Sequence, residues 1–331
     1  MKDLQLARVH RLLILLALAL PFLAQAQEYR YYRVGNRTDV AGAQKAGFAL
    51  MGGGADLDEA FRWLCERAGG GDLLVLRATN SDDYNSYIEK LCKVNSVATI
   101  VISSREAAGD PFVAQTIRHA SALFISGGDQ ANYINFWMGT PVQGALKDAI
   151  ARGVPIGGTS AGLAVMGEYA YSAQGDKPDD PNLDGKTAMA DPFGARITLV
   201  RGFLDVPILK GMITDTHFAK RNRMGRLLVF LARLNEQKIR GIGVEQGAAV
   251  LLEPDGTAKV VGRGSAYFVE PKENAAVLES GKPLTMRNVD VQKVSPGHAF
   301  NVKTWQGEAV DYSLSVDAGK IASTQAGGAV Y

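Results

Sequence analysis

Short apolar runs alternate with amphipathic segments of helical length between Phe48 and Ser160. The apolar runs lack an alternation with polar residues, so each suits a strand that is buried on both faces. Such strands with helices between them are typical of a mostly parallel sheet that helices cover on both faces, and the sequence therefore predicts an α/β fold. The expected strands with their turns are 47–54, 72–79, 97–103, 122–129 and 154–160, and the expected helices are 57–68, 84–94, 111–120 and a long region that ends at Ile150.

Glycine-rich turns follow three of the expected strands, after Met51, Ser126 and Ile156. Parallel α/β sheets bind ligands at the carboxyl ends of their strands, where these turns fall. We therefore expect the functional site at this edge of the sheet. Residues 172–194 are rich in Asp, Gly and Pro, and their length favours a surface loop that borders the site.

The sequence changes character after Glu245, where short strand-like runs replace the alternation of strand and helix. A Pro-Asp-Gly turn at 254–256 between two apolar runs predicts a hairpin. We expect a β-rich extension of the same domain rather than a second enzyme. The predicted organisation is a signal peptide at 1–26, an α/β core at 27–250 and the β-rich C-terminal extension at 251–331.

The N-terminus has the parts of a secretory signal peptide. A basic stretch precedes the apolar run LLILLALALPFLA, and AQAQ then offers a cleavage site after Ala26. The apolar run is shorter than the roughly 20 residues that cross a membrane. We expect a secreted or periplasmic chain that begins near Gln27 and has no membrane contact after cleavage. The alternative is an uncleaved membrane anchor.

The charge balance is nearly neutral, because 36 Lys and Arg face 34 Asp and Glu over 331 residues. A nucleic-acid partner is therefore not expected. No group of His, Cys, Asp and Glu has the spacing of metal ligands, and we expect neither a metal nor another cofactor. The two cysteines, Cys65 and Cys92, fall in expected helices, and the sequence leaves open whether they pair or remain free thiols.

Residues 158–162 fit the pattern G-x-S-x-G between an expected strand and an expected helix. A turn that exposes a serine oxygen crowds the positions two before and two after it, where glycine fits because it lacks Cβ. Ser160 is thus a candidate nucleophile, and the alternative is a serine that only caps the helix. The backbone N–H groups of Ala161 and Gly128 are candidate oxyanion donors, and Gln130 is a candidate substrate contact.

A nucleophilic serine needs a base, and His217 is the best candidate among the four histidines. It lies between an apolar run and an amphipathic helix, and Arg221, Arg223 and Arg226 follow it closely. A run of arginines usually forms a solvated helix face. Beside an active-site histidine, however, guanidinium groups are suited to hold a carboxylate of the substrate.

Four blocks in this order resemble the cyanophycinase branch of the S51 serine peptidases. They are SGGDQ at 126–130, GGTSAG at 157–162, DTHFAKRNRMGRL at 215–227 and GIGVEQGAAVLL at 241–252. The resemblance implies an α/β fold like that of the class I glutamine amidotransferases, and a serine hydrolase that forms a homodimer. It also implies cleavage of peptides with aspartyl linkages. Cyanophycinases release β-Asp-Arg from a poly-Asp backbone that carries arginine on its β-carboxyls.

The resemblance also implies roles by position. Ser160 matches the nucleophile and His217 the base, whereas Gln130 and the three arginines match substrate-binding positions. The family's third triad residue is a Glu near Gly241, in a block that carries paired acids.

Two positions depart from the family pattern. Thr216 replaces a Gln between Asp215 and His217, in a stretch expected to bind substrate, and Glu245-Gln246 replaces the paired acids. We expect Glu245 to orient His217, because it is the one acid in the core of its block, and Asp215 is the alternative.

The expected function is therefore secreted serine-type hydrolysis of aspartyl peptides, most simply an exopeptidase that releases β-Asp-Arg from cyanophycin. Export favours this choice, because an insoluble polymer outside the cell requires a secreted enzyme. One alternative is an aspartyl or isoaspartyl dipeptidase of the same family. Another is an inactive homologue that binds peptides, which the departures at Thr216 and Gln246 motivate.

Overall fold

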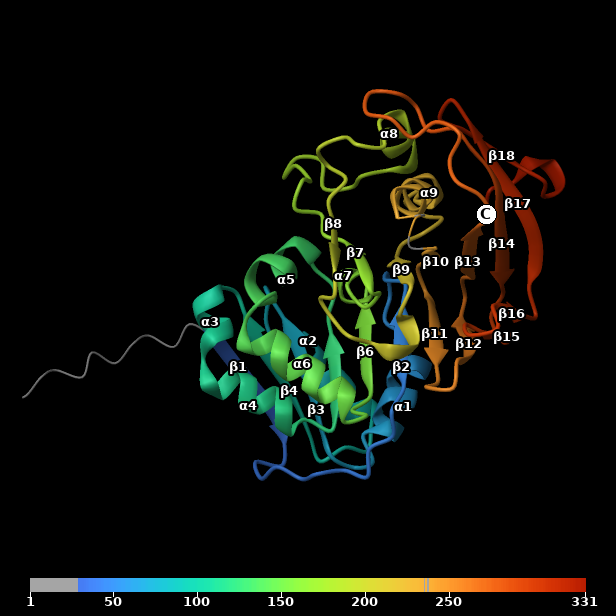
Figure 1. The fold of residues 1–331 in the computed structure, drawn as a ribbon. Coiled ribbons are helices and arrows are strands. Elements are labelled where there is room, and N and C mark those ends of the chain that lie inside the picture. Colours follow the sequence, from blue (N-terminus) through green and yellow to red (C-terminus); the bar gives the residue numbers. More distant parts are fainter. Residues whose placement is uncertain (1–28, 235, 237) are drawn as a thin grey trace, which may run out of the picture.

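The computed structural model describes residues 29–331 except 235 and 237, so the expected signal peptide lies outside the described residues. Two β-sheets lie side by side (Figure 1), the first largely in the blue and green part of the chain and the second largely in the yellow to red part. In the described part of the chain, no helix is long and apolar enough to cross a membrane.

The first sheet has ten strands in the order β1-β4-β3-β5-β6-β2-β11-β12-β15-β16. The five strands from β4 to β2 run parallel, and antiparallel strands flank them on both sides. The parallel strands are the apolar runs of the sequence, and every residue in them is buried. The strands are β1 (Tyr29–Gly35), β2 (Phe48–Met51), β3 (Asp72–Arg77), β4 (Ser96–Ile102), β5 (Ala122–Ile125), β6 (Ile156–Thr159), β11 (Ala248–Leu252), β12 (Thr257–Gly262), β15 (Ala299–Asn301) and β16 (Gln306–Gly307).

Helices cover both faces of this parallel core. Alternate residues of β3 point to opposite faces, so Leu73 and Val75 join the core beneath α1 and α2, whereas Leu74 and Leu76 join the core beneath α3 to α6. The same strands therefore contribute to an apolar core on each face of the sheet. The helices are α1 (Asp58–Arg67), α2 (Asp83–Leu91), α3 (Arg105–Gly109), α4 (Pro111–His119), α5 (Gln130–Trp137), α6 (Pro141–Ala151) and the short α7 (Ala161–Ala164).

The second sheet has eight strands in the order β18-β17-β14-β13-β10-β9-β7-β8. Only β10, β9 and β7 run parallel, and the remaining neighbours are antiparallel. Helix α9 is buried along nearly its whole length and shares a third core with this sheet. The elements are β7 (Tyr169–Tyr171), α8 (Gly185–Ala190), β8 (Leu199–Arg201), β9 (Met212–Asp215), α9 (Met224–Arg233), β10 (Arg240–Val244), β13 (Ala266–Pro271), β14 (Met286–Val294), β17 (Val310–Asp317) and β18 (Lys320–Ser323).

The α/β architecture is as predicted, and the expectation of one mostly parallel sheet is confirmed only in part: five strands of the first sheet and three of the second run parallel, whereas the other neighbours are antiparallel. Parallel neighbours need a long crossover between them, whereas after Glu245 short turns join several antiparallel neighbours, such as β11 with β12 and β17 with β18. The expected β-rich extension does exist as strands, yet it forms no layer of its own. It adds β12, β15 and β16 to the first sheet and β13, β14, β17 and β18 to the second.

The two cysteines form a disulfide between α1 and the end of α2. Cys65 and Cys92 have Cα atoms 5.8 Å apart and are separated by 27 positions in the sequence. Helices α1 and α2 cover the same face of the first sheet, and the bond fixes one to the other. The sequence left open whether Cys65 and Cys92 pair, and in the structure they are paired.

Replacing Cys65 and Cys92 together by Ala should lower the free energy of unfolding by about 3 kcal/mol, because the bond closes a loop of this length in the unfolded chain. Urea unfolding with and without a reductant measures the effect. The reductant should destabilise the unchanged protein and leave the double variant unaffected. Two titratable thiols in the unreduced, unfolded protein would contradict the pairing.

Candidate active site

Loops at the carboxyl ends of strands from both sheets meet at one place. The backbone N–H of His217, after β9, donates to the carbonyl of Gly52, after β2, at 2.8 Å. The N–H of Gly247, after β10, donates to the carbonyl of Gly53 at 2.9 Å. The junction of the two sheets therefore holds the residues that the sequence placed at strand ends.

Ser160 occupies a strained turn between β6 and α7. Its backbone has φ 52° and ψ −117°, a positive φ that non-glycine residues rarely adopt, and its side chain makes no cap bond to the helix. A Cβ on Gly158 would lie 2.7 Å from the backbone of Gly162, and a Cβ on Gly162 would lie 2.0 Å from the carbonyl oxygen of Ile125. Both glycines of the G-x-S-x-G pattern are thus required by close packing, and the geometry disfavours the simple cap.

The imidazole of His217 reaches Ser160 directly, with Nε2 2.7 Å from Oγ. The ring lies over the glycine turn after β2, because a Cβ on Gly53 would lie 2.5 Å from Cε1 of His217. The sequence drew attention to this turn only as one of three at strand ends. Its function in the structure is to leave room for the imidazole.

The expectation that Glu245 orients His217 does not match the geometry. Glu245 turns away, and its carboxylate accepts hydrogen bonds from Ser265 N–H at 2.8 Å and from the Tyr267 hydroxyl at 2.6 Å. Gln246, the next residue, lies instead with its amide nitrogen 2.6 Å from Nδ1 of His217. Glu245 and Gln246 begin the turn between β10 and β11, in which the Ala248 N–H donates to the Glu245 carbonyl at 3.2 Å, and this turn directs Gln246 rather than Glu245 toward the ring.

Asp215, the alternative partner, is also engaged elsewhere. Its carboxylate receives two parallel hydrogen bonds from Arg226, from Nε at 2.8 Å and from Nη2 at 2.5 Å, and both side chains are buried. Because an arginine and a carboxylate in this geometry form a strong bidentate pair, Arg226 is neutralised within the protein.

An amide beside Nδ1 has a consequence that a carboxylate would not have. When the amide nitrogen faces Nδ1, the ring proton lies on Nε2, and His217 donates to Ser160. A half-turn of the Gln246 amide places its oxygen against Nδ1 and leaves Nε2 free to accept the Ser160 proton. Only this second arrangement makes His217 a base.

The electrostatic surroundings keep His217 neutral. Burial, followed by the charges of Arg221 and Arg223, lowers the pKa of its imidazole to about 4, although Asp215 acts in the opposite direction. The ring is therefore uncharged at neutral pH and able to accept a proton.

The other two arginines have no carboxylate in bidentate contact. Arg223 is buried and hydrogen-bonds to the neutral oxygens of Thr216 and Asn182, with one Asp215 oxygen at 3.6 Å. Arg221 is exposed at the edge of the site, and burial of part of the side chain together with Arg226 lowers its pKa. Lys177 and the three arginines line the pocket together with Asp129 and Asp176, and Asp215 pairs with Arg226, so the site carries a small excess of positive charge.

Ser160 and the three arginines line one pocket of about 530 Å³. Gly128 comes from the turn after β5, whereas Gln130 is the first residue of α5 and donates a weak bond to the carbonyl of Tyr171 at 3.4 Å. Residues from 173 to 182 close the pocket, as expected of the 172–194 loop. Ala161 follows Ser160 directly at the start of α7. Among the side chains predicted to form the site, Glu245 is the exception. It does not line this pocket, and it does not contact His217, Arg223 or Arg226.

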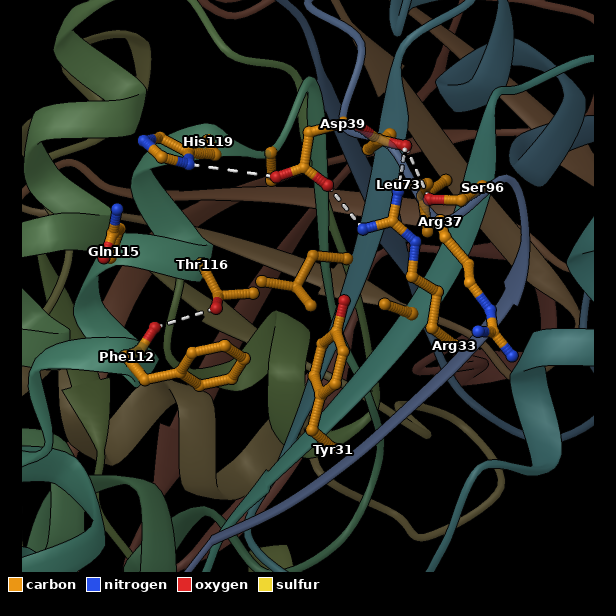
Figure 2. Close-up of a pocket in the computed structure, with 14 residues that line it drawn as sticks. Tyr31, Arg33, Arg37, Asp39, Leu73, Ser96, Phe112, Gln115, Thr116 and His119 are labelled. Carbon is orange, nitrogen blue, oxygen red and sulfur yellow. Dashed lines mark hydrogen bonds and ion pairs between the residues drawn. The ribbon is translucent and has the colours of Figure 1, made fainter.

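A second hollow, of about 380 Å³, lies at the opposite edge of the first sheet, by the amino ends of β3 and β4 (Figure 2). Several of its polar and charged groups pair with one another. Arg33 binds Asp39 and Asp72, and His119 Nδ1 lies 3.9 Å from Asp39. These contacts fasten the segment after β1 to the sheet. Within the described residues, no group of three or more His, Cys, Asp and Glu side chains could hold a metal ion.

Comparison with known proteins identifies the family of the chain. The family model described as peptidase family S51 matches residues 48–260, well over half of the chain. A cyanophycinase from Synechococcus elongatus is 29% identical over 255 residues, which span 73% of this chain and 74% of that protein. A cyanophycinase from Geminocystis herdmanii is 26% identical over 257 residues, which span 74% of this chain and 87% of that protein.

Among solved structures, that of a peptidase from an acI-B1 Actinobacterium shares the fold, with a TM-score of 0.52 and 16% identity. The match covers 78% of this chain and 98% of that chain. The chain belongs to peptidase family S51 and is a cyanophycinase-like serine peptidase.

Proposed function

We propose that the chain hydrolyses peptides with aspartyl linkages, with Ser160 as the nucleophile and His217 as the base. The observation that carries the proposal is the 2.7 Å approach of Ser160 Oγ to His217 Nε2 in a pocket with excess positive charge. A strained serine beside a neutral histidine is suited to acyl transfer, and cationic walls are suited to a substrate that carries carboxylates.

The reaction proceeds in two halves. His217 Nε2 accepts the Ser160 proton as Oγ attacks the peptide carbonyl, and the N–H groups of Gly128 and Ala161 stabilise the oxyanion. The imidazolium then gives its proton to the leaving amine, which departs and leaves an ester on Ser160. Water attacks this ester with His217 again as the base, and the acid product leaves. Gln246, through its amide oxygen, holds the Nδ1 proton in both halves.

The most specific substrate we propose is cyanophycin, with release of β-Asp-Arg. The relatives named cyanophycinase support this choice. A dipeptidase for aspartyl or isoaspartyl peptides is the second candidate. It is favoured by Thr216, which is buried and bonded to Arg223, so it offers the substrate no amide in place of the family's Gln.

We further propose that the protein works outside the cytoplasm. The Cys65–Cys92 disulfide supports this proposal, because such bonds persist mainly in oxidising compartments. The signal peptide at 1–26 and the homodimer stay predictions from the sequence and the family resemblance.

Replacing Ser160 by Ala should abolish release of β-Asp-Arg from cyanophycin, because the acyl-enzyme can no longer form. The measurement is product release by the mature protein and by the variant, with melting curves to show that both are folded. A panel of β-Asp-Arg, α-aspartyl and isoaspartyl peptides separates the polymer-degrading enzyme from the dipeptidase.

A fluorophosphonate probe tests the triad without any assumption about substrate. Labelling should require both Ser160 and His217, and Ser160→Ala and His217→Asn should each remove it. A folded protein that is not labelled, or a Ser160→Ala variant with undiminished turnover, would contradict the mechanism and favour a binding protein.

Replacing Gln246 by Glu should raise kcat at neutral pH by about tenfold or more, because a carboxylate at Nδ1 stabilises the imidazolium and selects the basic tautomer. The unchanged enzyme should lose kcat/KM only as the pH falls through about 4, where His217 becomes protonated. In Gln246→Glu this acid limb should move upward by roughly one to three pH units.

Gln246→Ala is the matched control for this prediction. It removes the contact without adding charge, so it should lower kcat and leave the acid limb without an upward shift. An acid limb at the same pH in Gln246→Glu and in the unchanged enzyme would show that residue 246 does not face His217.

A further inference from the structure

Arg223 is a buried cation that the protein holds almost entirely with neutral oxygens. Its Nε and Nη2 donate to the side-chain oxygen of Asn182 at 3.2 and 2.9 Å. Its Nη1 donates to the carbonyl and to the hydroxyl of Thr216 at 3.0 and 3.1 Å. The guanidinium is thereby fixed in orientation, but its charge is not cancelled by these contacts.

Arg226, one turn further along α9, shows the opposite arrangement. It is bonded through Nε and Nη2 to Asp215, and its Nη1 donates to the carbonyl of Leu183. Both arginines line the pocket that contains Ser160. The two cations thus differ in one respect that matters for binding: Arg226 has a bidentate carboxylate partner and Arg223 has an amide in the same role.

Asn182 is well placed to define the position of Arg223. Its oxygen must face the guanidinium, because its NH₂ group would oppose two donors. The chain is pinned just after it, since Leu183 accepts from Arg226 and the Gly185 N–H donates to the carbonyl of Asn222 at 2.9 Å. Asn182 therefore holds Arg223 from a segment that is itself fixed by hydrogen bonds to Arg226 and Asn222.

An amide at this position leaves Arg223 one unpaired N–H among the described contacts, since the four bonds above use four of its five. It also leaves the positive charge available to a ligand. Burial and the nearby charge of Arg226 lower the pKa of Arg223 to about 9, as expected for a cation that lacks full compensation.

We propose that Asn182, together with Thr216, is a positioning residue that presents Arg223 as an incompletely neutralised anchor for a carboxylate of the substrate, since Asp215 lies 3.6 Å from Arg223 and is shared with Arg226. The inference rests on the proposed function for the identity of that substrate. It also gives Thr216 a function, because its hydroxyl accepts a hydrogen bond from Arg223 Nη1 at 3.1 Å.

Replacing Asn182 by Asp tests the proposal with almost no change in shape. The new carboxylate would pair with Arg223 and occupy its charge. KM for an isoaspartyl peptide should rise at least about tenfold, the usual effect of losing one hydrogen bond to a charged partner, while kcat changes much less. The melting temperature should stay the same or rise, because a neutral bond has become an ion pair.

Two controls separate charge from position. Asn132→Asp adds the same charge to the wall of the same pocket, and its effect on KM should be clearly smaller than that of Asn182→Asp. Fluorophosphonate labelling should be retained in Asn182→Asp, because the neutral probe does not need Arg223 and a carboxylate beside Arg223 would strengthen rather than weaken His217 as a base. An unchanged KM in Asn182→Asp would overturn the proposal, as would equal KM changes in both variants.

Binding of succinate, measured by calorimetry, keeps the two proposals distinguishable. If the unchanged protein cleaves no aspartyl peptide, the proposed function fails. Succinate binding that is present in that protein and weakened at least about tenfold in Asn182→Asp would still support the role of Asn182. Absent succinate binding in the unchanged protein, or equal affinities in the two proteins, would overturn it.

Discussion

The site depends on the close approach of His217 to the glycine turn after β2. Its N–H binds the carbonyl of Gly52, and its ring lies where a Cβ on Gly53 would be. This contact joins a strand of the first sheet to a loop of the second, and it brings the imidazole to Ser160, whose own N–H donates to Met51. A side chain larger than hydrogen at position 53 would separate base from nucleophile, so the alignment of the whole junction rests on this turn.

Around that junction, the arginines and His217 differ in whether their hydrogen-bond partner is neutral or ionised. Asp215 neutralises Arg226, whereas an amide holds Arg223 and another amide faces His217. Burying a charge without a partner costs free energy, so a protein that keeps such a charge in a pocket must recover that free energy in another interaction. Here burial, and after it the positive charge of Arg221 and Arg223, lowers the basicity of His217, and the same charge favours an anionic ligand.

The sequence was sufficient for the parts of the site that short patterns define. Glycine spacing identified Ser160, and the surroundings of four histidines identified His217. The choice between Glu245 and Gln246 was beyond it, because both residues lie at the turn after β10, and no pattern in the sequence decides which side chain of the turn meets the ring. Asn182 was missed because a loop without periodicity carries no signal of what it will contact. The parallel core followed from the apolar runs, but the way the tail divides between two sheets depends on tertiary packing.

The neutral partner of His217 and the cationic pocket can be understood together. Proton transfer from Ser160 creates an imidazolium, which an amide cannot stabilise as a carboxylate does, and which Arg221 and Arg223 further disfavour. A substrate carboxylate bound at these arginines would cancel part of the charge that lowers the pKa of His217. The base would then be strongest when an anionic substrate is in place, and a neutral peptide would meet a weaker one. Selectivity for acidic peptides would in this way arise in the chemical step as well as in binding.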